Sequence, residues 1–296
     1  MACLLVKKNL HVSPEARFTR TALLMKKNLH IMPLKGHYVR GGGRGYKGIK
    51  LVGEVVDSSG DCVCNDYLGC CSAIDGLTVP VSFPSSPESV NTQFELYTRS
   101  NTQDAVLLDY KPGSVNEALQ QFKERKHLIF FVPGWLDPTF IRLPTIKALL
   151  EKEDVNVILV KWSGGSFKIN CIQAAGDTAL VGRQMSVLVQ NLMSVFPDTV
   201  NVLDIHVIGD SLAAQVPGFF AKQLKRCTGK VIGRISANEA AAPLFEDTGV
   251  FVSYKDVKFV DAIYTIGGDI GMFQPIGHVD FYPNNAKRQP GLFVAQ

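Results

Sequence analysis

The chain has 296 residues, 46% of them hydrophobic, and a formal net charge of +4. This length favours one large domain with extensions over two equal halves, and the absence of a run of about 18 apolar residues excludes a membrane-spanning helix of the usual kind. The charge is unevenly distributed, because residues 1–50 carry eleven Lys or Arg and one acidic residue, whereas the rest carries 20 Lys or Arg and 26 Asp or Glu. The body of the chain is therefore mildly acidic and its N-terminal arm is basic.

Residues 1–60 have the composition of a basic, repetitive extension outside the fold. Leu4–Val12 recurs with small changes as Leu23–Ile31, and Arg40–Gly45 is glycine-rich and loop-like. Such an arm can also bind nucleic acid or an acidic membrane surface, or act as an organelle transit peptide. A nucleic-acid partner is the less favoured interpretation. The apolar stretch before Lys7 is too short for a secretory signal peptide, so the arm does not indicate a subcellular location.

Four of the seven cysteines lie close together after this arm, at Cys62, Cys64, Cys70 and Cys71. A zinc site needs a second pair of Cys or His ligands at suitable spacing, and Cys171 and Cys227 stand alone. We therefore expect no metal and favour a small disulfide-closed loop formed in an oxidising compartment, with a zinc site and unpaired thiols as alternatives. The odd count leaves at least one thiol free or paired between chains.

Strand and helix patterns alternate along the body of the chain. Period-two alternation predicts a half-buried strand, continuous apolar runs predict buried strands, and apolar residues at helical spacing predict helices. In chain order we expect a strand at Gln93–Thr98, a buried strand at His127–Val132, a helix at Pro144–Lys152, a buried strand at Val155–Trp162, a helix at Thr178–Val195, a strand before Ser211, a helix after it, and a strand at Val231–Ile235. This alternation predicts an α/β fold, with a parallel sheet covered on both faces. Sites in such folds form at the carboxyl ends of the strands.

The segment Gly209–Ala213 reads Gly-Asp-Ser-Leu-Ala and joins a predicted strand to a predicted helix. This is the layout of a nucleophile elbow, in which a sharp turn exposes a serine whose neighbours two positions away must be small. Acyl transfer at Ser211 would need two N–H donors for the oxyanion, one after the nucleophile and one from an earlier strand-end loop. We expect Leu212 and Trp135 to supply them. The alternative is a serine that caps the following helix.

Further motifs keep the order and approximate spacing of one enzyme family. They are Cys64-x5-Cys70, Ser86–Thr92, Pro133–Asp137, Val160–Ser166, Gly209–Ala214, Asp256–Asp261 and Ile276–Asn284. From about Asn65 onward the chain thus resembles the pancreatic-type (neutral) lipases of the α/β-hydrolase superfamily.

The resemblance implies an α/β-hydrolase fold over residues 61–296, with a mostly parallel central sheet, helices on both faces and an incomplete C-terminal part. It implies a carboxylic ester hydrolase of lipids, either triacylglycerols or phospholipids, that works at a lipid–water interface, needs no cofactor and is extracellular. It also implies that Ser211 is the nucleophile, that Glu239 is the acid of the triad, and that Cys64 and Cys70 form a disulfide.

The chain departs from the family pattern at the residues that carry out the reaction in the family. The family elbow reads Gly-His-Ser-Leu-Gly, so Asp210 replaces a histidine and Ala213 a glycine, while Glu239 stands where the family has aspartate. Pro217 lies in the helix after the elbow, where an interior proline costs about 3 kcal/mol or more but the first turn tolerates it. The one histidine after Glu239 is His278, which belongs to a block that the family has in addition to its catalytic histidine.

The family's catalytic histidine follows a Gln-Pro-Gly-Cys sequence, and this chain has Leu292 at the cysteine and ends at Gln296. We therefore expect no triad histidine and a structural role for His278. A calcium loop of many family members is also reduced, with Asp256 kept and Ser253 in place of a second carboxylate, so we expect no calcium. Without its base, a triad keeps only about 10³–10⁴-fold catalysis. The sequence thus predicts an impaired hydrolase, with a non-catalytic lipid-binding homologue and a poorly folding product as alternatives.

Overall fold

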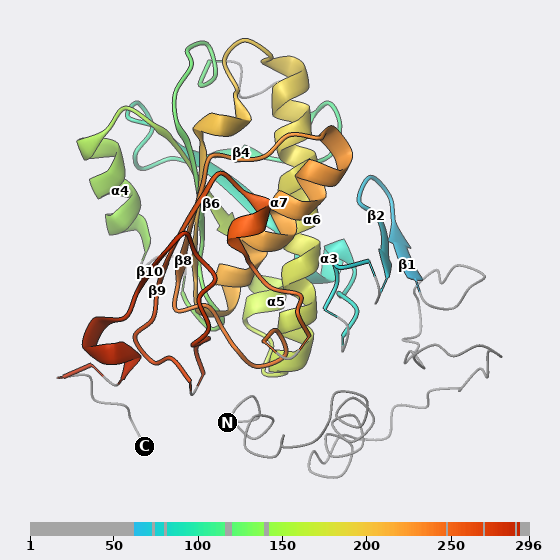
Figure 1. The fold of residues 1–296 in the computed structure, drawn as a ribbon. Helices are drawn as coiled ribbons and strands as arrows, with labels where there is room; N and C mark the ends of the chain where they lie inside the picture. Colours follow the sequence, from blue (N-terminus) through green and yellow to red (C-terminus); the bar gives the residue numbers. More distant parts are fainter. Residues whose placement is uncertain are drawn as a thin grey trace.

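The computed structural model describes residues 62–72, 75–79, 82–115, 120–138, 142–246, 248–268, 270–287 and 289–290. The extension expected at residues 1–60 lies outside them. The described part is built around a central sheet with helices packed against it (Figure 1). The sheet has eight strands in the order β10-β9-β8-β7-β5-β6-β3-β4. Its strands are β3 (Gln93–Tyr97), β4 (Val106–Leu108), β5 (Leu128–Val132), β6 (Asn156–Lys161), β7 (Ile205–Asp210), β8 (Arg234–Asn238), β9 (Phe259–Ile263) and β10 (Val279–Phe281).

The sheet is mostly parallel, as the sequence predicts. Strands β5 to β10 all run parallel to one another, and β3 runs antiparallel to both of its neighbours, β4 and β6. The register aligns the carboxyl ends of the central strands, pairing Val132 with Gly209 and Asp210 with Asn238. Loops that leave β5, β7 and β8 therefore meet at one edge of the sheet, where sites of α/β proteins form.

Helices lie on both faces of the sheet (Figure 1). They are α3 (Pro87–Val90), α4 (Leu143–Lys152), α5 (Ser163–Ser166), α6 (Cys171–Val195) and α7 (Val216–Thr228). The long helices α6 and α7 cover one face, where they form the main hydrophobic core with inward residues of the strands. Gly182 allows the two helices to approach closely, because a Cβ there would lie 2.7 Å from the Phe219 Cβ.

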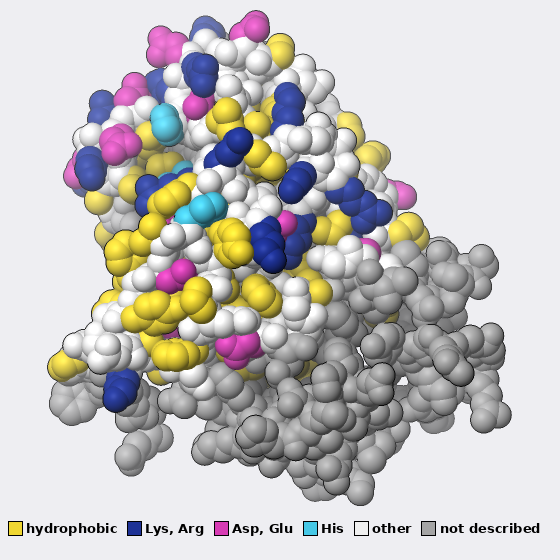
Figure 2. All heavy atoms as spheres, in the orientation of Figure 1, with side chains coloured by type: hydrophobic (Ala, Val, Ile, Leu, Met, Phe, Trp, Pro, Cys, Tyr) yellow, Lys and Arg dark blue, Asp and Glu magenta, His cyan; other side chains and the backbone are white. Residues whose placement is uncertain are grey.

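The opposite face is covered unevenly. Helix α4 places Ile146 and Leu150 on the β3, β5 and β6 side chains, while the same face of β7 to β10 carries mostly exposed and half-buried residues. Phe259, Val279 and Phe281 on this face are exposed, and Figure 2 shows hydrophobic side chains gathered on the side where Figure 1 draws β9 and β10. An antiparallel sheet can face water on one side, whereas parallel strands are ordinarily buried on both.

Most predicted elements are confirmed, and the predicted starts of α6 and β8 are displaced. Helix α6 begins at Cys171, seven residues before the predicted start, because the Asn170 side chain caps it by accepting from the Ile172 N–H. The strand before the elbow begins at Ile205, after a short 3-10 turn, and β8 begins three residues later than predicted. Pro217 falls in the first turn of α7, where the missing N–H removes no helical hydrogen bond.

A two-stranded hairpin lies outside the main sheet. It pairs β1 (Cys62–Asn65) with β2 (Gly69–Ser72), and a Cys64–Cys70 disulfide closes it, as the family resemblance implies. Among the described residues, no helix has the length and apolar character needed to cross a membrane.

Candidate active site

Ser211 follows the last residue of β7 and adopts the left-handed conformation, with φ of 54°. Its side chain is exposed at the carboxyl edge of the sheet. The serine begins a 3-10 turn, Ser211–Gln215, and α7 follows at Val216. No side chain caps either helical segment, so the capping alternative for Ser211 is not what the structure shows. A left-handed non-glycine residue costs about 1–2 kcal/mol, a strain that is common at functional sites.

Small residues around Ser211 make this sharp turn sterically feasible. A Cβ on Gly209 would lie 2.6 Å from the Ala213 carbonyl oxygen and 2.8 Å from the Ala214 Cα. A Cβ on Gly134 would lie 3.3 Å from the Ser211 Cβ. Gly134 follows β5, so the loop after that strand packs directly against the elbow.

We call Pro133–Asp137 the oxyanion loop, because the sequence predicts that Trp135 supplies one of its donors. Three hydrogen bonds fix this loop to the segment 162–168. The Trp162 indole donates to the Pro133 carbonyl oxygen (2.9 Å), the Leu136 N–H donates to the Ser166 carbonyl oxygen (3.0 Å), and the Trp135 indole donates to the Lys168 carbonyl oxygen (2.7 Å). Leu136 has a φ of 59°, so the loop also contains a strained residue.

The second expected donor, Leu212, is buried and is the second residue of the 3-10 turn. The N–H groups at the start of a helical segment have no intrahelical acceptor, which leaves the Leu212 N–H available beside Ser211. The oxyanion loop, which carries Trp135, thus packs against the elbow, which carries Ser211 and Leu212.

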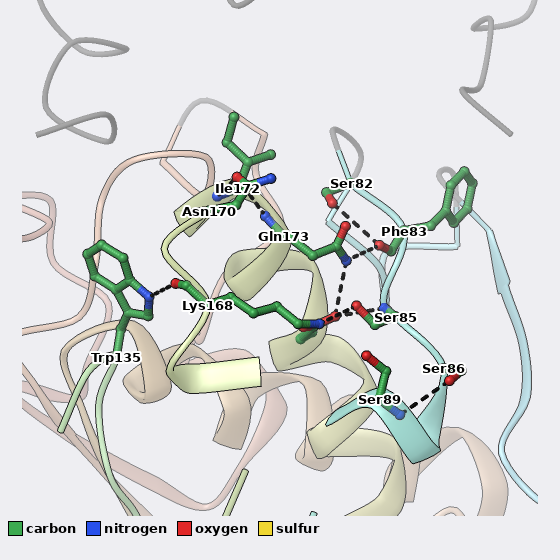
Figure 3. A network of polar contacts seen from close by, with 11 residues as sticks. Ser82, Phe83, Ser85, Ser86, Ser89, Trp135, Lys168, Asn170, Ile172 and Gln173 are labelled. Atoms are coloured by element: carbon green, nitrogen blue, oxygen red, sulfur yellow. Dashed lines mark hydrogen bonds and ion pairs between the residues drawn. The ribbon is translucent and has the colours of Figure 1, made fainter. Parts of the chain in front are cut away.

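Lys168 connects the oxyanion loop to a buried polar cluster (Figure 3). Its ammonium group lies 2.9 Å from Asp177 Oδ2 in α6 and donates to the Ser85 Oγ (2.6 Å). Asp177 also accepts from the Ser85 N–H (2.7 Å) and from the Gln173 side-chain amide (3.1 Å). Sequence reasoning did not identify this cluster, because its members belong to segments that only the fold brings together.

Glu239 follows β8 directly and also adopts the left-handed conformation, with φ of 50°. Its Oε2 accepts from the Thr265 N–H, the Thr265 hydroxyl and, at 2.9 Å, the Ile266 N–H. Its Oε1 is buried, faces Gly271 and has no hydrogen-bond partner among the described residues. The Ala241 N–H donates to the Ser211 carbonyl oxygen (3.2 Å), so the segment that carries Glu239 is tied to the elbow.

The three histidines of the described residues lie away from Ser211. His278 accepts the Val260 N–H at its Nδ1 (2.9 Å) and stacks on Phe259. Val260 lies level with Val207 in the sheet. Val207 precedes Ser211 by four residues, which corresponds to about 13 Å along β7. His206 contacts the Ser236 hydroxyl at 2.8 Å, earlier on β7, and His127 precedes β5. The geometry places His278 in a structural contact.

Asp210, the residue that replaces the family's elbow histidine, contacts groups from two other segments. The Asn238 side-chain amide donates to its Oδ1 (2.8 Å), and the Arg142 guanidinium lies 3.0 Å from its Oδ2. Arg142 also donates to Asp137. Burial raises the pKa of the Asp210 carboxyl above its ordinary value, Asn238 and Arg142 oppose this effect, and the Asp137 charge adds to it. The sequence identified Asp210 as unusual but not its partners.

No cluster of three or more His, Cys, Asp or Glu side chains within the described ranges could hold a metal ion. In the segment where the sequence predicts a reduced calcium loop, Lys222 Nζ lies 3.6 Å from Asp256 Oδ2. A lysine charge therefore already faces the carboxylate that the loop retains.

Comparison with known proteins identifies the family. The model of the Lipase family matches residues 63–295. Human pancreatic triacylglycerol lipase is 34% identical over 256 residues, covering 81% of this chain and 52% of the relative. Pancreatic lipase-related protein 2 of Myocastor coypus is 34% identical over 249 residues, covering 78% and 51%, and that of Cavia porcellus is 34% identical over 247 residues, covering 77% and 54%.

The chain thus spans about half the length of these curated relatives. Among solved structures, the esterase PE8 superposes with a TM-score of 0.35 at 10% identity, over 48% of this chain and 69% of its own. That score is too low to add to the assignment, which rests on the sheet order, the elbow and the family match. The chain belongs to the lipase family, and within it to the pancreatic-type lipases.

Proposed function

We propose that this chain binds carboxylic esters of lipids, of the triacylglycerol or phospholipid class, at its lipase elbow, and that Ser211 attacks them much more slowly than in a lipase with a complete triad. One observation carries the proposal: Ser211 stands exposed in a left-handed turn directly against the oxyanion loop. The triacylglycerol class comes from the name of a relative, of which the chain covers about half.

The chemistry assigns separate roles to the described residues. Ser211 Oγ attacks the ester carbonyl carbon, and the Leu212 and Trp135 N–H groups stabilise the oxyanion that forms. Collapse of this intermediate breaks the ester C–O bond and releases the alcohol, which takes its proton from solvent, and water then hydrolyses the acyl-serine. Glu239 would orient a histidine base through its buried, unpartnered Oε1. None of the histidines within the described residues is placed to take the Ser211 proton, so the proton passes to solvent instead. Loss of the base in a serine hydrolase lowers kcat by about 10⁶-fold.

A serine-directed fluorophosphonate probe tests this proposal, because it forms a stable bond only with an activated or well-positioned serine. We expect slow labelling of the chain and none of Ser211→Ala, which differs by one exposed oxygen. Added imidazole supplies an external base, so it should accelerate labelling of the chain but not of Ser211→Ala.

Labelling that persists in Ser211→Ala would contradict the assignment of the nucleophile. Labelling as fast as that of a complete lipase would contradict the impairment. If folded protein is not labelled even with imidazole, yet binds triacylglycerol or phospholipid vesicles, the chain is a lipid-binding homologue without catalysis, which is the second candidate function.

We further propose an extracellular location. The Cys64–Cys70 disulfide supports it, since disulfides form and persist mainly in oxidising compartments. Peptide mapping of the protein from culture medium and from cell lysate, without reduction, tests this: the disulfide-linked peptide should be found in the medium fraction, and its confinement to the lysate would contradict the proposal.

A further inference from the structure

Arg142 lies between two carboxylates, one at the end of the oxyanion loop and one at the last residue of β7. Its Nη2 is 3.0 Å from Asp210 Oδ2, in the elbow, and its Nε donates to Asp137 Oδ2 across 2.9 Å, at the end of the oxyanion loop. Its guanidinium carbon also stands 5.6 Å from the centre of the Phe131 ring. The Arg142, Asp137 and Asp210 side chains are each less than one-third exposed, so water screens these charges only partly.

We propose that Asp210 and Arg142 are positioning residues that hold the oxyanion loop against the nucleophile elbow through an Asp137–Arg142–Asp210 bridge. The inference rests on the proposed function, because it concerns the loop that would supply an oxyanion donor. It assigns a role to the residue that replaces the family's elbow histidine: Asp210 contributes a charge that Arg142 can bind, and Asn238 fixes its second oxygen.

The oxyanion loop needs such a constraint because it is strained. Leu136 has a φ of 59°, and strain of this kind persists only where the surroundings enforce it. The hydrogen bonds to Ser166 and Lys168 hold one side of the loop. The bridge holds the other side, where a Gly134 Cβ would lie 3.1 Å from the Asp210 carbonyl oxygen.

Arg142 also separates two like charges. Without it, the carboxylates of Asp137 and Asp210 would face each other with no cation between them, and like charges in one site repel or force one group to take up a proton. Loss of Arg142 should therefore release the loop from the elbow. Loss of the Asp210 charge should do the same, because Arg142 would then bind Asp137 alone.

Trp135 allows the loop to be observed without any reaction. The chain has two tryptophans, Trp135 half-buried in the loop and Trp162 buried beneath it. Subtracting the emission of Trp135→Phe isolates the Trp135 signal. We expect Arg142→Gln and Asp210→Asn each to shift this emission to longer wavelength and to increase its quenching by acrylamide. The double variant should change no more than Arg142→Gln alone, because both substitutions break the same link.

Arg125→Gln is the matched control. Arg125 forms a more exposed ion pair with Asp204, 2.6 Å away at the amino end of β7, so the Trp135 signal should not change in this variant. Urea unfolding of each variant separates a released loop from a destabilised protein. An unchanged Trp135 signal in Arg142→Gln, or additive changes in the double variant, would overturn the bridge.

Fluorophosphonate labelling provides the second readout. Where the chain is labelled, Arg142→Gln and Asp210→Asn should lower the labelling rate by about 10²-fold, as expected for a misplaced oxyanion donor, with Arg125→Gln unchanged. An unchanged labelling rate in both variants would overturn the positioning role. If the parent chain is not labelled at all, the proposed hydrolysis fails, while the Trp135 measurement still decides whether the bridge exists.

Discussion

The ammonium group of Lys168 lies 2.9 Å from Asp177 Oδ2, and the Asp177 side chain is fully buried. This ion pair connects α6 to the segment whose carbonyl oxygen accepts from the Trp135 indole (Figure 3). The position of the oxyanion loop therefore depends on an ion pair whose carboxylate is buried in α6.

Replacing Asp177 should destabilise the protein strongly. Asp177→Ala removes the carboxylate partner of Lys168, leaves the Ser85 N–H without its acceptor and removes one of the two acceptors of the Gln173 amide. Breaking a buried pair from one side costs about 3–5 kcal/mol. Urea unfolding measures this loss, and Asp198→Ala, at an exposed position of the chain, should change the free energy of unfolding by less than about 0.5 kcal/mol. Equal effects of the two substitutions would contradict the role given to the cluster.

Replacing Glu239 should hardly change the reactivity of Ser211. The acid of a triad acts through its histidine, and its neutralisation in a complete triad lowers kcat by about 10⁴-fold. No histidine among the described residues connects Glu239 to Ser211. We therefore expect Glu239→Gln to be labelled by fluorophosphonate at nearly the parent rate once the variant is shown to be folded. A fall of several orders of magnitude would reveal a working base.

A methyl group at Gly209 should disrupt the elbow. The added Cβ of Gly209→Ala would lie 2.6 Å from the Ala213 carbonyl oxygen, and overpacking of this kind costs about 1–3 kcal/mol. We expect lower stability in thermal unfolding and a loss of Ser211 labelling. Gly229→Ala is the control, because Gly229 has a φ of +71° and no atom within 4 Å of the added Cβ. It should cost about 1–2 kcal/mol from strain alone and leave labelling unchanged.

Acid should destabilise the protein through His206. Burial, and secondarily the Arg234 charge, lower the pKa of His206 from 6.5 to about 4, while Asp261 opposes them. Between these values the unfolded chain binds the proton and the folded chain does not, so stability present above the unfolded pKa falls as the pH falls through this window. From pH 7 to pH 5 we expect His206 to account for a loss of about 2 kcal/mol.

Urea unfolding at both pH values, with His206→Gln as the comparison, checks this expectation. The variant lacks the titrating imidazole, so its stability should fall less between pH 7 and pH 5 than that of the parent. Equal losses in the two proteins would show that His206 does not contribute.

Patterns within single segments predicted much of the fold, because burial imposes a periodicity on each element. β5 and β6 are continuous apolar runs and were predicted to within a residue or two. The start of β8 was predicted three residues too early, because Ile232 is already buried before the strand begins, while pairing with β7 starts only at Arg234. The beginning of α6 was missed because its signal is the capping side chain of Asn170 and not hydrophobic spacing.

The candidate site, too, could be predicted only in part from the sequence. The position of Ser211 and the candidate donor Leu212 follow from one continuous motif. The Asp137–Arg142–Asp210 bridge and the Lys168–Asp177 pair do not, because each depends on which loops and helices meet in three dimensions. Charged residues that are separated in sequence carry no local pattern that would pair them.

The one-sided cover of the sheet gives the two halves of the protein unequal resistance to local opening. β5 lies between two strands and under helices on both faces, whereas β10 is a three-residue edge strand beside an exposed apolar surface. Backbone amides exchange with solvent first where packing is thinnest. The sheet should therefore open progressively from β10 toward β7. The strand that presents Ser211 lies at the boundary between the strands that open readily and those that open only when the whole domain unfolds.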